Sequence, residues 1–154
     1  MYIDVDNQKT YIATGSKDHI QGNMGITFIH GTAMDHTVWT LASRHFARRG
    51  LNILAVDLPG HGRSEGDVIP SIEGMADWVI KALDASNQDK SIIVGHSMGS
   101  LVAFDVAARY PDRITALAMV GTSIPMPVGD VLLDNAKADK HVAKEMVNFW
   151  SHSQ

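Results

Sequence analysis

Four short apolar runs, each separated from the next by a stretch of helical periodicity, constrain the fold of this chain more than any other feature. The runs are residues 25–29, 52–56, 91–94 and 114–120. Strands that are apolar along their whole length are typical of a parallel sheet covered on both faces. The stretches between them supply the helical crossovers that parallel strands require. The pattern therefore predicts an α/β fold with a mostly parallel sheet and helices on both faces.

The first thirteen residues follow a different rhythm. Residues 2–5 and 10–13 read as two short strands, and polar residues 6–8 lie between them. Two such runs joined by a polar turn indicate an antiparallel β-hairpin, which we expect at one edge of the sheet. Further along, Ser71 is placed to cap a helix, and Pro111 closes a helix over residues 98–109.

Composition excludes several classes of protein. The chain has 154 residues, of which 45% are hydrophobic and 19% are charged, so it has the composition of a folded domain. The formal net charge is −4, which does not suggest a nucleic-acid or anionic-membrane surface. There is no cysteine, and no apolar run long enough to cross a bilayer. Since the first residues also lack the pattern of a secretory signal, we expect a cytoplasmic protein without nucleic-acid or membrane partners.

The sequence Gly-His-Ser-Met-Gly at residues 95–99 carries the strongest chemical signal. It matches the G-x-S-x-G pattern of a nucleophile elbow, in which a serine lies on a sharp turn between a strand and a helix. Small neighbours are needed because the turn is strained and closely packed. Here an apolar strand precedes the pattern and a helix follows it, so Ser97 is the candidate nucleophile. The backbone N–H of Met98, at the start of the helix, is a candidate donor to an oxyanion.

A second donor is expected from the loop that follows the first apolar strand. This loop reads His30-Gly31-Thr32. A tetrahedral intermediate is stabilised by two N–H groups, one after the serine and one from an earlier loop. The backbone N–H of Thr32 is the candidate.

These residues together resemble the α/β-hydrolase fold family, especially its esterase-like members with a helical cap. The resemblance rests on the His30-Gly31-Thr32 loop with Trp39, on residues 57–64 (Asp-Leu-Pro-Gly-His-Gly-Arg-Ser), on residues 95–99 and on residues 110–113 (Tyr-Pro-Asp-Arg). It implies a catalytic triad in the chain order serine, acid, histidine. A serine at position 97 argues against the family's dehalogenases and epoxide hydrolases, which use aspartate there.

The resemblance implies further parts that this sequence does not supply. Residues 121–125, where some members carry the triad acid, contain no carboxylate, and the loop that carries the histidine base follows a strand that the chain does not reach. We therefore expect residues 1–125 to form the N-terminal part of a truncated α/β-hydrolase core, and residues 126–154 to begin the cap. The acid and base are expected outside the chain.

None of the eight histidines is expected to replace the missing base. Three of them occupy motif positions that do not supply the base in the family: His30, His61 and His96. The other five lie in loops or on helices, where we expect solvated side chains: His19, His36, His45, His141 and His152. The spacings H-x-H and H-E-x-x-H do not occur, so we expect no metal and no cofactor.

The favoured function is a serine hydrolase that acts on small carboxylic esters and is catalytic only when the missing part completes it. Two alternatives stay open: an inactive fragment or binding module that keeps the fold, and a thioesterase or C–C bond hydrolase of the same family. In this truncated core the 114–120 strand becomes an exposed apolar edge. Because such an edge can pair with another chain, we expect either self-association through it or coverage of it by helices from residues 128–150.

Overall fold

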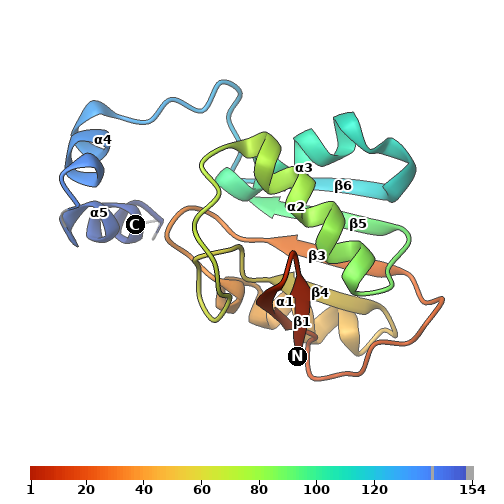
Figure 1. Ribbon diagram of the computed structural model, residues 1–154. Helices are drawn as coiled ribbons and strands as arrows, with labels where there is room; N and C mark the ends of the chain where they lie inside the picture. Colours follow the sequence, from red (N-terminus) through yellow and green to blue (C-terminus); the bar gives the residue numbers. More distant parts are fainter. Residues whose placement is uncertain (140, 152–154) are drawn as a thin grey trace. The chain divides into compact units, whose positions relative to one another are not determined.

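A computed structural model describes residues 1–139 and 141–151 of the protein (Figure 1). The chain divides into two compact units after Thr122. The first unit holds six strands: β1 (Tyr2–Val5), β2 (Gln8–Ala13), β3 (Gly25–Ile29), β4 (Asn52–Val56), β5 (Ser91–His96) and β6 (Ile114–Val120). Their order across the sheet is β1-β2-β4-β3-β5-β6.

The direction of the strands follows from how they are connected. β1 and β2 form the expected hairpin, and β2 also pairs antiparallel with β4. β4, β3, β5 and β6 are parallel neighbours, and the pairs Ile29 with Val56 and Ile29 with Gly95 fix the register at their carboxyl ends. The carboxyl ends of β3, β4 and β5 therefore lie side by side, and the loops that leave them meet at one edge of the sheet.

Helices cover both faces of the sheet. α2 (Ile72–Ala85) and α3 (Met98–Arg109) pack on one face, and α1 (Thr40–Ala47) packs on the other, as Figure 1 shows. Their apolar faces enclose the central strands, so that every residue of β3 and β4 is buried. This burial explains why those strands read as continuous apolar runs.

Local signals set the ends of the helices. The Ser71 hydroxyl accepts a hydrogen bond from the N–H of Gly74 and caps α2, as predicted. α3 begins directly after Ser97 and ends before a 3₁₀ turn (Pro111–Arg113). Another 3₁₀ turn (His36–Trp39) precedes α1, and the Asp35 carboxylate caps it by accepting from the N–H of Thr37.

The second unit begins at Ser123 and contains α4 (Asp130–Lys137) and α5 (His141–Ser151). His152, one of the histidines expected in solvent, lies outside the described residues. Over residues 1–139 and 141–151, no helix has the length and apolar character that spanning a membrane would require.

The predicted fold class is confirmed, with a mixed six-stranded sheet, mostly parallel strands and an N-terminal antiparallel hairpin. The strand at residues 91–94 extends two residues further, to His96. β6 differs from the other parallel strands because most of its side chains are exposed, including Leu117 and Val120. Its position at the end of the sheet leaves it with a strand neighbour on one side, β5.

Candidate functional site

Ser97 lies at the sharp corner between β5 and α3. Its backbone has φ 53° and ψ −122°, a left-handed conformation that costs a residue with a side chain about 1–3 kcal/mol. Three hydrogen bonds hold the corner. The Ser97 N–H donates to the carbonyl of Val120 at 2.9 Å, and the carbonyl of Ser97 accepts from the N–H of Ser100 at 2.8 Å and from the Ser100 hydroxyl. The side chain is half-buried, so the turn leaves Ser97 accessible.

The two glycines of the pattern are required by packing. A Cβ at Gly99 would lie 2.5 Å from the carbonyl oxygens of both Ile29 and His30, and a Cβ at Gly95 would collide with the carbonyl of Gly99. The absence of these side chains lets the first turn of α3 press against the end of β3. The glycines therefore determine how close Ser97 comes to the loop after β3.

The loop after β3 lies next to the serine. A Cβ at Gly31 would be 3.2 Å from the Cβ of Ser97, so the backbone of this loop passes directly beside the corner. Thr32 follows it, is exposed, and its N–H donates no hydrogen bond to any part of the chain that the structure describes. The N–H of Met98 is the first of α3, where the helix offers no acceptor. Two backbone donors are thus available beside Ser97.

His30 fixes the start of this loop and is completely buried. Its Nδ1 is 2.8 Å from the carbonyl of Gly31, to which it donates, and its Nε2 accepts from the N–H of Leu58 at 3.2 Å. Both contacts require a neutral ring with the proton on Nδ1. Burial lowers the pKa of His30, which agrees with this arrangement.

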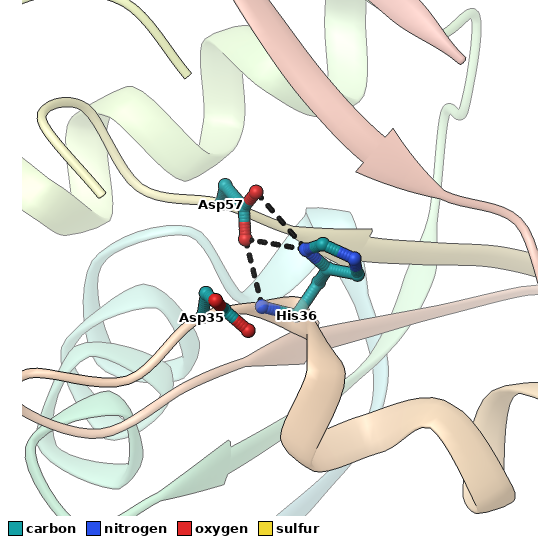
Figure 2. A group of neighbouring side chains, drawn as sticks. All are labelled: Asp35, His36 and Asp57. Atoms are coloured by element: carbon teal, nitrogen blue, oxygen red, sulfur yellow. Dashed lines mark hydrogen bonds and ion pairs between the residues drawn. The ribbon is translucent and has the colours of Figure 1, made fainter. Parts of the chain in front are cut away.

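A buried carboxylate fixes the other end of the loop (Figure 2). Asp57, directly after β4, is completely buried and accepts from the backbone N–H of His36 at 2.7 Å. It also accepts from His36 Nδ1 at 2.9 Å and from the N–H of Arg63 at 2.9 Å. The loop after β4 closes tightly around it, since a Cβ at Gly62 would collide with the same carboxylate. Asp57 therefore ties the loop after β3 to the loop after β4.

Asp35, His36 and Asp57 bring ligand atoms within 4.8 Å of one another, as a metal site would require. The geometry does not favour a metal, because these atoms are already engaged. Asp57 binds three N–H groups, and His36 Nδ1 donates to Asp57. Asp35 accepts from the N–H and the hydroxyl of Thr37, bonds that hold its pKa below the usual value although burial acts to raise it. The cluster is therefore a set of hydrogen bonds that joins the loop after β3 to the loop after β4.

Sequence reasoning missed the role of His36. It was expected to be solvated, but it is 9% exposed and paired with Asp57. The available signal was Asp57 at the end of a buried strand, because a buried carboxylate needs a hydrogen-bonding partner such as His36. Of the other histidines expected in solvent, His45 and His141 are exposed and His19 is half-buried.

Comparison with known proteins places these features in a family. Residues 26–150 match the model of the alpha/beta hydrolase fold family. The chain is 37% identical over 103 residues to a pimeloyl-[acyl-carrier protein] methyl ester esterase from Citrobacter koseri, a match that covers 67% of this chain. The match spans 38% of that esterase, so this chain corresponds to a minor part of its length.

Solved structures agree with this assignment. The structure of a thermophilic esterase is 25% identical, with a TM-score of 0.68, and the match covers 93% of this chain and 52% of that one. An enzyme described as degrading N-acyl homoserine lactones is 24% identical, with a TM-score of 0.73, and the match covers 90% of this chain and 52% of that one. Together with the family match over residues 26–150, these likenesses show that the chain belongs to the alpha/beta hydrolase fold family.

Proposed function

We propose that Ser97 is the nucleophile of a serine hydrolase that cleaves small carboxylic esters. The observation that carries the proposal is the left-handed backbone of Ser97, at φ 53°, in a residue that is not glycine. Such strain persists where the surrounding packing enforces it, and it is a recurrent property of functional residues. The relative from Citrobacter koseri, described as a methyl ester esterase, supports an ester as the substrate class.

In the proposed reaction the Ser97 hydroxyl attacks the carbonyl carbon of the ester, and its proton passes to a base. The carbonyl oxygen becomes an oxyanion, which accepts hydrogen bonds from the N–H groups of Thr32 and Met98. These donors are fixed before the substrate arrives, because His30 and Asp57 hold the loop after β3 and the helix holds Met98. The alcohol then leaves, and water hydrolyses the acyl-serine.

We propose that the base and its acid partner come from chain beyond these 154 residues. The contacts of the described histidines support this: both ring nitrogens of His30 are engaged, and no histidine in the part of the chain that the structure describes is hydrogen-bonded to Ser97. Residues 126–154 would then begin a helical cap, and residues 1–125 would form the N-terminal part of the core. In this proposal the protein works in the cytoplasm, which fractionation of its source cells tests.

The exposed edge of β6 leads to a further part of the proposal. β6 ends the sheet with its outer backbone groups free to pair, and its exposed side chains are apolar or small apart from Thr115. We propose that a second copy of the chain pairs with this edge when the missing part of the core does not cover it.

The test compares this chain with a fusion in which the remaining part of the Citrobacter koseri esterase follows residue 125. Short-chain methyl and p-nitrophenyl esters are the substrates. We expect negligible turnover by the chain alone and clear turnover by the fusion, reduced at least about a thousandfold by Ser97→Ala. The proposal that Ser97 is the nucleophile fails if the Ser97→Ala fusion keeps its activity. The proposal that the base lies beyond residue 154 fails if the 154-residue chain alone cleaves esters in a Ser97-dependent way.

A further inference from the structure

A cavity of about 270 Å³ opens on the first unit between the end of β2 and the start of α1. One wall is formed by Tyr11 and the turn that follows β2, and the other by His36, Ser43 and Arg44. The walls are in direct contact, since a Cβ at Gly15 would lie 2.5 Å from the carbonyl of Ser43. Ser97, Thr32 and Met98 do not line this cavity, so it is distinct from the proposed ester site.

Ser43 provides a polar group without a protein partner. Its residue is 2% exposed and lines the cavity, and its hydroxyl makes no hydrogen bond within the part of the chain that the structure describes. Buried hydroxyls are normally hydrogen-bonded, and rotation about the Cα–Cβ bond can redirect this one. A ligand oxygen in the cavity would supply the missing partner.

His36 provides a second polar group. Its Nδ1 is bound to Asp57, and no described residue hydrogen-bonds to Nε2. Asp57 lies behind the ring and orients it through Nδ1. The other ring nitrogen therefore has no partner among the described residues.

The ten residues that line the cavity include an arginine, Arg44, and no carboxylate, while the Asp57 carboxylate lies behind the His36 ring. The Arg63 guanidinium lies 4.8 Å from the ring centre of Tyr11, on the wall. Burial and, second, the charge of Arg63 lower the pKa of the Met1 amino group, so the field of Arg63 reaches this wall.

We propose that this cavity binds a small oxyanion, a phosphate or a carboxylate, through the Arg44 guanidinium and the Ser43 hydroxyl, beside the His36 ring. Arginine matches both groups because its forked donors can bind two oxygens at once. The volume of about 270 Å³ is below the range of about 300–1,000 Å³ typical of drug-sized ligands, which favours a compact anion over an acyl chain.

The test is an NMR titration of the 15N-labelled chain with sodium phosphate and, separately, with sodium acetate. Sodium chloride at matched ionic strength is the reference. We expect saturable shifts in the Ser43 and Arg44 amides and in the His36 ring signals, with a Kd of about 1 mM for at least one anion. Saturation by phosphate alone assigns the site to phosphate groups, and saturation by acetate alone assigns it to carboxylates.

Two variants and one control locate the site. Arg44→Gln and Ser43→Ala each weaken binding at least about fivefold. The control, Arg48→Gln, leaves binding unchanged. Arg48 lies near Arg44 and Arg49 on a neighbouring surface, but it does not line this cavity. Ser43→Ala removes only one oxygen atom and is the smaller change. It therefore still tests the site if the Arg44→Gln variant does not fold. Absence of saturation up to 50-fold the expected Kd, equal shifts with chloride, or equal loss in Arg48→Gln would overturn the proposal.

Discussion

At the scale of single residues, the loop beside Ser97 is held by buried polar groups that have few alternatives. His30 must stay neutral to bind Leu58, and the buried Asp57 carboxylate accepts from three N–H groups. Neither residue was assigned a role from the sequence, because burial and partners depend on which loops meet at the sheet edge. Ser97, by contrast, could be singled out, since its glycine neighbours encode a local backbone requirement.

Replacing Asp57 tests the buried hydrogen bonds that join the loops after β3 and β4. Asp57→Asn removes the charge that the N–H groups of His36 and Arg63 face, and it adds an amide group where donors already converge. We expect it to lower the free energy of unfolding by about 3 kcal/mol. Urea unfolding measures this. The control is Asp6→Asn, which breaks the exposed pair with Lys81 and should cost much less; equal losses would contradict the role given to Asp57.

His30 makes stability depend on pH in a defined direction. Because its pKa in the folded protein lies below the ordinary value of 6.5, the folded state binds fewer protons than the unfolded state just below that pH. Its contribution is therefore complete above pH 6.5 and is lost as the pH falls toward the lowered pKa. The difference in unfolding free energy between the wild type and His30→Gln should shrink over this window, by at most about 1.4 kcal/mol per pH unit.

The control for His30 is His45→Gln, since His45 is exposed on α1. Its difference from the wild type, measured over the same pH range, is the reference for His30→Gln. A wild-type advantage over His30→Gln that grows on acidification would show that the buried ring is charged, and the hydrogen-bond assignment would be wrong.

At the scale of elements, the contact between α3 and β3 positions the corner. The sequence predicted both elements and the need for small residues, because apolar runs and glycine spacing are local signals. It could not predict that Gly99 faces the carbonyls of Ile29 and His30, which lie about seventy positions earlier in the chain. That contact exists only once β3 and β5 are paired.

Gly99→Ala tests this contact. The added Cβ would meet two carbonyl oxygens at 2.5 Å, so α3 must shift, and we expect a loss of about 1–3 kcal/mol in the free energy of unfolding. Gly129→Ala, at the start of α4, is the control because nothing lies within 4 Å of its added Cβ. Thermal or urea unfolding that ranks the two variants equally would contradict the packing described at the corner.

β6 gives a prediction about association. If a second copy pairs with its free edge, the chain should be dimeric by light scattering, and the amides of residues 114–120 should exchange more slowly at high protein concentration. The Val120 carbonyl accepts from Ser97 on the β5 side, so the backbone groups of Leu117 face the outer edge. Leu117→Pro, which removes an N–H from this outer edge, should shift the chain toward the monomer. A monodisperse monomer with rapid exchange along β6 would contradict the proposal.

At the scale of the whole molecule, the sequence predicted the fold class, the hairpin and the family, because these follow from periodicity and from motifs of several residues each. The match spans 38% of the Citrobacter koseri esterase. The described residues contain the proposed nucleophile and the two proposed donors, and the proposed base lies elsewhere. Substrate preference depends on surfaces beyond this core, so the sequence carries little signal for it.

The central proposal, that Ser97 is the nucleophile, is tested most directly by covalent labelling with an alkyl fluorophosphonate, read by intact mass and peptide mapping. A single addition needs no deacylation step, so it can proceed slowly without the missing base. We predict one adduct per chain, located on Ser97, absent in Ser97→Ala and retained in Ser123→Ala, which changes an exposed serine. Labelling of another residue, or equal labelling of Ser97→Ala, would contradict the account.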